Sequence, residues 1–195
     1  MRRLSSVAAI GAGLLVLALR PAPAPRSALA GSTVSGKVKF VGKAPANPAI
    51  DMGEEPKCKA KYTTPPHEEI VMVNKNGTLA NVFVYVKAGL PADAKYPAPA
   101  TPVVIDQSGC MYKPHVIGLM TGQSFEIKNT DPTNHNIHPM PTVNADWNES
   151  QSPGQAPLTK SFARQEVMIP VKCNVHPWMR SYIGVVGNPF FAVTG

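Results

Sequence analysis

Two stretches of the sequence carry side chains that can bind a metal ion. The first runs from Cys173 to Met179 with His176 between them, and it offers a thiolate, an imidazole and a thioether within seven residues. The second contains His135 and His138. Soft sulfur donors combined with imidazole are typical of copper sites. A Cys at the end of a strand, followed by a tight loop, lets several donors converge on one point.

The donor set itself predicts the kind of copper site. Two His, one Cys and a weakly bound Met form the trigonal site of blue-copper electron carriers. We therefore predict that His135, Cys173 and His176 bind one copper ion, with Met179 in the axial position. The alternative is that the Cys and the Met are ordinary core residues, because both are often buried for packing alone. The spacing of His at +3 and Met at +6 from the Cys favours ligation.

The remaining histidines are weaker candidates for metal ligands. His138 lies three residues from His135, so a strand would turn it to the opposite face, and we expect it at the surface or beside a ligand. His115 would reach the sheet end that carries the ligand loop if 115–120 and 123–129 form a hairpin. We expect a structural role for it, with a second metal site as the alternative. His67 lies in a loop and is expected to be solvated.

The three cysteines divide into one metal ligand and one pair. With Cys173 on copper, Cys58 and Cys110 are free to form a disulfide in an oxidising compartment. Such a disulfide would attach the long 42–67 loop to the rest of the domain. The alternative is a free Cys58, which the flanking lysines would make reactive.

The N-terminus has the pattern of an export signal. Arg2 and Arg3 precede an apolar run from Val7 to Leu19, and the small-residue triplet 28–30 follows. The run is short for a membrane span. We therefore predict a signal peptide over 1–30 and an exported, periplasmic chain that starts near Gly31 and is not stably inserted in a membrane. Retention of the segment as an anchor is the alternative.

Composition suits one globular domain rich in turns, with 21 Pro and 15 Gly among 195 residues. The formal net charge is +7, but Arg2, Arg3, Arg20 and Arg26 lie in the leader, which leaves +3. A weakly positive domain without a clustered basic stripe does not fit a nucleic-acid binder. We therefore expect no nucleic-acid partner.

Apolar and polar residues alternate over 33–41, which predicts a strand with one buried face, and the rest of the chain is interpreted as further short strands. The dipeptide Asn76-Gly77 favours a tight hairpin turn. No helical periodicity of more than about two turns is found outside the leader. The class is all-β, with two sheets packed as a sandwich. The predicted strands are 33–41, 69–73, 80–87, 103–106, 115–120, 123–129, 159–163, 165–172, 182–186 and 190–194.

These residues resemble the cupredoxins. The Cys-x-x-His-x-x-Met run over 173–179 is similar to the short ligand loop of the amicyanins, and 114–137 is similar to the plastocyanin segment that ends at the first His ligand. The resemblance extends from Pro114 to the C-terminus and leaves 31–112 unmatched. The matched positions of the second segment are a turn Gly, a strand-end Asn, the ligand and the Asn after it, here Gly122, Asn129, His135 and Asn136.

The resemblance implies a Greek-key, cupredoxin-like β-sandwich with an N-terminal extension. Residues 31–195 would form a single domain, in which 31–112 adds strands and a long loop and 113–195 is the copper-binding core. Asn136 would hold the ligand loop through hydrogen bonds near Cys173. Electrons would leave through an apolar surface at the edge of His176, formed by Trp178, Met140 and nearby prolines.

Together these inferences predict an exported type 1 (blue) copper protein that transfers single electrons and is not an enzyme. It would hold one copper per chain and meet a redox partner protein, a c-type cytochrome or a dehydrogenase, by transient contact. The alternative is a periplasmic copper chaperone or a docking module of a larger exported redox complex. A third possibility is a catalytic copper site that recruits His115 or His138.

Overall fold

The structure is a computed structural model that describes residues 33–195. The predicted signal peptide over 1–30 lies outside the described residues. The chain divides into two units, and every helix and strand described below belongs to the second, 36–195. In the described part of the chain, no helix is long and apolar enough to cross a membrane.

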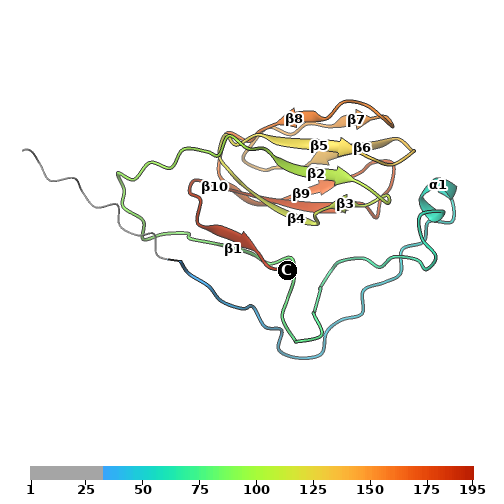
Figure 1. Ribbon diagram of the computed structural model, residues 1–195, viewed down its shortest axis with the longest axis horizontal. Coiled ribbons are helices and arrows are strands. Elements are labelled where there is room, and N and C mark those ends of the chain that lie inside the picture. Colours follow the sequence, from blue (N-terminus) through green and yellow to red (C-terminus); the bar gives the residue numbers. More distant parts are fainter. Residues whose placement is uncertain (1–32) are drawn as a thin grey trace, which may run out of the picture. The chain divides into compact units, whose positions relative to one another are not determined.

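The second unit consists of one short helix and a series of short strands (Figure 1), so the predicted all-β class is confirmed. The elements of residues 36–195 are α1 (Pro56–Lys59), β1 (Phe83–Tyr85), β2 (Val103–Gln107), β3 (Tyr112–Lys113), β4 (Val116–Met120), β5 (Phe125–Asn129), β6 (His135–Pro139), β7 (Glu149–Gln151), β8 (Leu158–Lys160), β9 (Glu166–Lys172), β10 (Arg180–Val186) and β11 (Phe191–Val193).

Two main sheets form the sandwich. One has the strand order β4-β10-β9-β6-β7 and the other β3-β2-β5-β8. Alternate residues of both sheets point inward and are buried together, which is how two half-buried sheets share one core. Ile105 and Ile127 come from the four-stranded sheet, and Ile137, Ile169 and Ile183 from the five-stranded sheet; all are at most 1% exposed.

The predicted hairpin of 115–120 with 123–129 is wrong. β4 pairs in parallel with β10, and β5 pairs in parallel with β2, so consecutive strands lie in different sheets. The tight turn with Gly122 at φ 76° connects them. Four of the five residues of β4 are buried, so the strand lacks the alternation that is typical of a hairpin strand with one face in solvent. His115 nevertheless lies beside the ligand loop end, because its carbonyl accepts the N–H of Tyr182 on β10.

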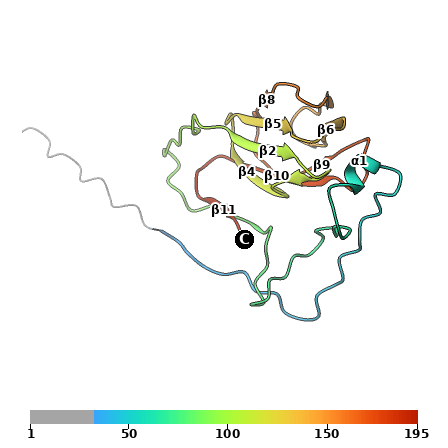
Figure 2. The same cartoon turned by 45° about the vertical axis from the view of Figure 1, so that its right-hand side comes forward.

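The predicted strands at 33–41 and 69–73 are not formed. Only isolated bridges occur there, between Lys39 and Thr78 and between Val73 and Leu79. The alternating pattern of the first stretch does not lead to burial of Val41, which is 93% exposed. Figure 2 shows residues 36–41 as an extended loop outside the sandwich.

A small ribbon of β1 and β11 packs on the five-stranded sheet. Gly118 of β4 and Gly184 of β10 are paired, and a side chain at either position would collide with an aromatic ring of the ribbon. The rings are those of Phe83 and Phe191. The two glycines therefore let β1 and β11 approach the sheet closely.

Candidate metal centre

A hairpin and a neighbouring strand position the predicted ligands. β9 and β10 are antiparallel with Lys172 opposite Arg180, so residues 173–179 form the loop that joins them. Within this loop, the N–H of Cys173 donates to the carbonyl of Met179 at 3.2 Å, and the N–H of Met179 donates to the carbonyl of His176 at 3.0 Å. β6 pairs with the end of β9 and carries His135 past it toward the loop.

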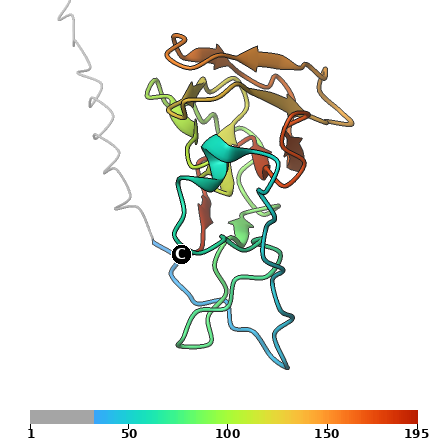
Figure 3. The same cartoon turned by 90° about the vertical axis from the view of Figure 1, so that its right-hand side faces the viewer.

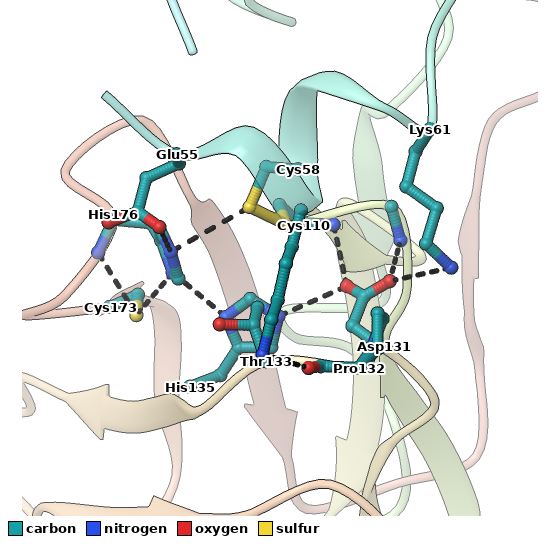
Figure 4. Close-up of a disulfide and its surroundings, with 12 residues drawn as sticks. Glu55, Cys58, Lys61, Cys110, Asp131, Pro132, Thr133, His135, Cys173 and His176 are labelled. Carbon is teal, nitrogen blue, oxygen red and sulfur yellow. Dashed lines mark hydrogen bonds and ion pairs between the residues drawn. A yellow bond between two sulfur atoms is a disulfide. The ribbon is translucent and has the colours of Figure 1, made fainter. Parts of the chain in front are cut away.

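The structure brings together three of the four predicted ligands. His135, Cys173 and His176 are buried, and one donor atom from each lies within 4.8 Å of the other two. The Nδ1 atoms of the two histidines are 2.9 Å apart, and the Cys173 Sγ is 3.8 Å from His176 Nδ1 (Figure 4). Two imidazole nitrogens and one thiolate are the equatorial donors of a blue-copper site.

The orientation of the two imidazoles fits a cation between them. The Nε2 of His135 faces a carboxylate oxygen of Asp131 at 3.0 Å, and the Nε2 of His176 faces one of Glu55 at 3.6 Å. A proton on each Nε2 leaves two Nδ1 lone pairs facing each other at 2.9 Å. Either a proton or a metal ion must separate them, so the residues present suit a metal.

The surroundings of Cys173 favour its thiolate form. Burial alone would raise its pKa, but hydrogen bonds from His135 and His176 outweigh burial and lower the pKa to about 5. The side-chain bond from His176 needs a proton on Nδ1, the position that a bound metal would take instead. The thiolate is therefore the main form at neutral pH, and it is the form that binds metals. The N–H of His176 also donates to the sulfur at 3.4 Å.

Asp131 and His135 form a buried pair. Burial opposes charge on both, yet the hydrogen bond with His135, followed by the N–H groups of Cys110 and Gly109, lowers the pKa of Asp131 to about 2. Burial would likewise lower the pKa of His135, but Asp131 and then Cys173 raise it. The Nζ of Lys61 lies 3.5 Å from the same carboxylate. The carboxylate is thus fixed before any metal arrives.

Asn136 connects the first ligand strand to the ligand loop. Its Oδ1 accepts the N–H of Asn174 at 2.6 Å and lies 3.2 Å from the Cys173 sulfur. The hydroxyl of Tyr112 donates to the Asn136 carbonyl, and burial, followed by the nearby Cys173, raises the pKa of that hydroxyl. Asn136 therefore holds the loop where the resemblance to cupredoxins expects it.

The fourth predicted ligand, Met179, is fully buried directly before β10. Its axial role stays a prediction.

The predicted disulfide between Cys58 and Cys110 is formed. The alternative of a free, reactive Cys58 is therefore wrong. The bond joins α1 to the loop between β2 and β3 across 52 residues. It lies against the candidate site, because Cys58 Sγ is 3.7 Å from His176 Nε2. Figure 3, seen from the side of α1, shows the helix in front of the sandwich.

The expected apolar exit at the edge of His176 is wrong. His176 is 0% exposed, because Glu55 and the disulfide of the extension cover its Nε2 side. Trp178 packs against it with ring centres 5.2 Å apart and donates from Nε1 to the Cys110 carbonyl at 3.0 Å. The extension, which the resemblance left unmatched, therefore closes this side of the site.

The other histidines take structural positions. His138 is half-buried, with Nδ1 3.3 Å from the side-chain oxygen of Asn174. His115 Nδ1 lies 3.1 Å from a Glu69 oxygen, and exposed His67 contacts a backbone carbonyl. Within 33–195, none of the side-chain groups that could hold a metal contains any of the three.

Sequence reasoning missed two residues of the site, Asp131 and Glu55. A carboxylate four residues before a predicted ligand is a signal that can be read from the sequence, since ligand histidines usually bond to a carboxylate or a carbonyl. No such signal existed for Glu55, which comes from a distant part of the chain.

Solved structures with a similar fold are cupredoxins. A variant of amicyanin in the reduced state is 20% identical, with 51% of this chain and 99% of that chain covered and a TM-score of 0.40. The purple cupredoxin from Nitrosopumilus maritimus is 18% identical, with 43% and 98% covered and a TM-score of 0.37.

A third neighbour is a much longer chain. It is the Cu-containing nitrite reductase NirK from Thermus scotoductus SA-01, 20% identical, with 49% of this chain covered and a TM-score of 0.39. This chain spans only 24% of the reductase. A scan against protein-family models and a search of curated proteins gave no match. The function proposed below is therefore inferred from the side chains of the site.

Proposed function

We propose that the protein is an exported type 1 copper protein that transfers single electrons. One copper ion per chain would be bound by His135, Cys173 and His176, with Met179 as the axial ligand. The observation that carries the proposal is the convergence of two Nδ1 atoms and a low-pKa thiolate in one buried place. Bound copper supplies one-electron redox chemistry there.

The chain's own contribution is a rigid, dry set of donors. Two strands, the hydrogen-bonded loop and Asn136 hold the donor atoms, so little rearrangement accompanies a change of charge at the site. Burial keeps water and small anions away from the donors. A site of this kind suits electron transfer rather than catalysis on a substrate, and we propose that the protein is not an enzyme.

The partner of such a carrier would be another exported redox protein, a c-type cytochrome or a dehydrogenase, that docks transiently in the periplasm. The alternative is a copper chaperone, or a docking module of a larger exported redox complex. Easy loss of Cu(I) to a chelator would favour the chaperone, whereas retention of copper in both oxidation states would favour the carrier.

The first test is a titration of the purified protein with Cu(II), followed by visible and electron paramagnetic resonance spectra. We expect an intense blue band at one copper per chain, with narrow copper hyperfine splitting. The Cys173→Ser variant should lose the band, and the His138→Gln variant, which changes a histidine outside the donor set, should keep it. Colourless binding, or a band that survives Cys173→Ser, would contradict the proposal.

A further inference from the structure

Each candidate ligand histidine turns its second ring nitrogen toward a carboxylate (Figure 4). The distances are 3.0 Å from His135 Nε2 to Asp131 and 3.6 Å from His176 Nε2 to Glu55. Both imidazole rings are 0% exposed, so water does not compete for these nitrogens. In a dry site, a carboxylate beside a ring nitrogen decides which nitrogen carries the proton.

The two carboxylates are held in different ways. The side chain of Asp131 is 0% exposed and accepts the N–H groups of Gly109 at 2.8 Å and Cys110 at 2.6 Å. Its orientation is therefore set by the backbone. Its fourth contact is Lys61, which approaches from the solvent side.

Glu55 reaches the site from the other side and is 35% exposed. It directly precedes α1, and the disulfide fixes that helix to the sandwich. Cys58 of the same helix lies 3.7 Å from the same His176 nitrogen that Glu55 faces. The disulfide therefore helps to hold Glu55 beside His176.

We propose that Asp131 and Glu55 are positioning residues that keep the proton of each imidazole on Nε2 and direct both Nδ1 lone pairs to the metal. The extension thus completes a site whose donors all come from the C-terminal half. This inference rests on the proposed function for the identity of the metal. The proton positions, in contrast, can be measured in the metal-free protein.

The proposal has consequences for copper binding. A carboxylate that accepts the second N–H of a ligand histidine makes the imidazole a stronger donor. Stronger donors stabilise Cu(II) more than Cu(I), so removing either carboxylate should raise the reduction potential. Loss of such a partner typically costs about 10- to 100-fold in metal affinity. Asp131 is closer and better fixed, so its removal should have the larger effect.

The variants Asp131→Asn and Glu55→Gln test the proposal. The matched control is Glu54→Gln, because Glu54 is the exposed neighbour of Glu55 and changes the charge of the extension equally. Nitrogen-15 NMR of the histidine rings, in the metal-free and the Cu(I) protein, reports the proton positions. Copper affinity and reduction potential are measured on the same samples.

We expect His135 and His176 to carry a proton on Nε2 in the wild type and in Glu54→Gln. In Glu55→Gln, the metal-free His176 should become a mixture of tautomers, with a smaller loss of copper affinity than the loss of about tenfold or more in Asp131→Asn. Both variants should have a raised potential. Unchanged tautomers and potentials would overturn the proposal, even if folding stability falls.

The experiment separates the two proposals. If the wild type fails to form a blue copper centre, the proposed function fails, and the spectra of the metal-free protein still decide whether the carboxylates place the protons. If Asp131→Asn does not fold, Glu55→Gln, whose side chain is partly exposed, carries the test.

Discussion

The C-terminal core (residues 113–195) and the extension (residues 36–112) both contain runs of alternating apolar and polar residues, but these runs adopt different structures. In the core, alternating residues form strands whose apolar side chains meet across two sheets, as Ile127 and Ile183 do. In the first part of the extension, the same alternation leaves Val41 93% exposed. A strand pattern thus needs a partner surface before it forms a strand. Later in the extension, β2 joins the four-stranded sheet, and residues 55–58 contribute contacts with the candidate metal centre.

The largest expected effect tests how the extension is attached. Replacing both Cys58 and Cys110 by Ala removes a crosslink over 52 residues, and the chain-entropy estimate for such a loop is about 4 kcal/mol of the free energy of unfolding. Urea denaturation of the metal-free protein measures the loss. A change below about 1 kcal/mol would mean that other contacts, not the disulfide, hold α1 in place.

A matched pair of truncations compares the two regions directly. Ile183→Ala empties a fully buried position of β10 and should cost about 3 kcal/mol. Val41→Ala in the extension should change stability by less than about 0.5 kcal/mol, because the side chain is already in water. Equal costs in denaturant melts would refute the distinction between the regions.

A smaller effect is expected where the two regions meet. In Gly118→Ala, the new Cβ would lie 2.5 Å from a ring atom of Phe191 and 2.8 Å from one of Phe83, so the β1 and β11 ribbon must move. We expect a loss of about 2 kcal/mol. Gly36→Ala is the control, since nothing lies within 4 Å of its Cβ position, and its thermal midpoint should stay near that of the wild type.

The smallest expected effect is the contribution of Glu166, in the C-terminal core, to the pH dependence of stability. Burial opposes the charge of Glu166, but the N–H groups and side chains of Thr142 and Asn144 together outweigh it and lower the pKa from 4.5 to about 2. A lowered folded pKa contributes stability above pH 4.5 that is lost as the pH falls toward 2. Because the group is partly exposed, we expect less than about 1 kcal/mol.

Urea melts of wild type and Glu166→Gln across this pH range provide the measurement. The wild type should be the more stable protein at pH 6, and the difference should vanish near pH 2. A difference that grows on acidification would show that the sign is wrong.

Local chemistry was enough to predict much of the site from the sequence. The spacing of Cys173, His176 and Met179 places them in one loop, and the runs 165–172 and 182–186, which correspond to β9 and β10, are predicted as strands. β6 was missed, because its polar residues His135 and Asn136 are buried by the site and hide the alternating pattern.

Pairing over long distances was harder to predict. Nothing local to β4 indicates that it lies beside β10 rather than β5, since pairing depends on the whole sheet. The contact between Glu55 and His176 joins residues 121 positions apart and depends on where the disulfide places α1. Cysteine counting predicted that bond but not the residues it would bring beside the metal centre.

The position of the disulfide has a consequence for the order of assembly. The sulfur atoms of Cys58 and Cys110 lie within 4.8 Å of a His176 ring nitrogen, so in a reduced chain they would compete with Cys173 for copper at the same imidazole. Once they are joined to each other, Cys173 is the one free thiol among residues 33–195. Oxidation of the pair before the proposed copper ion binds would therefore leave that ion a single thiol partner, so the choice of sulfur would depend on which reaction comes first.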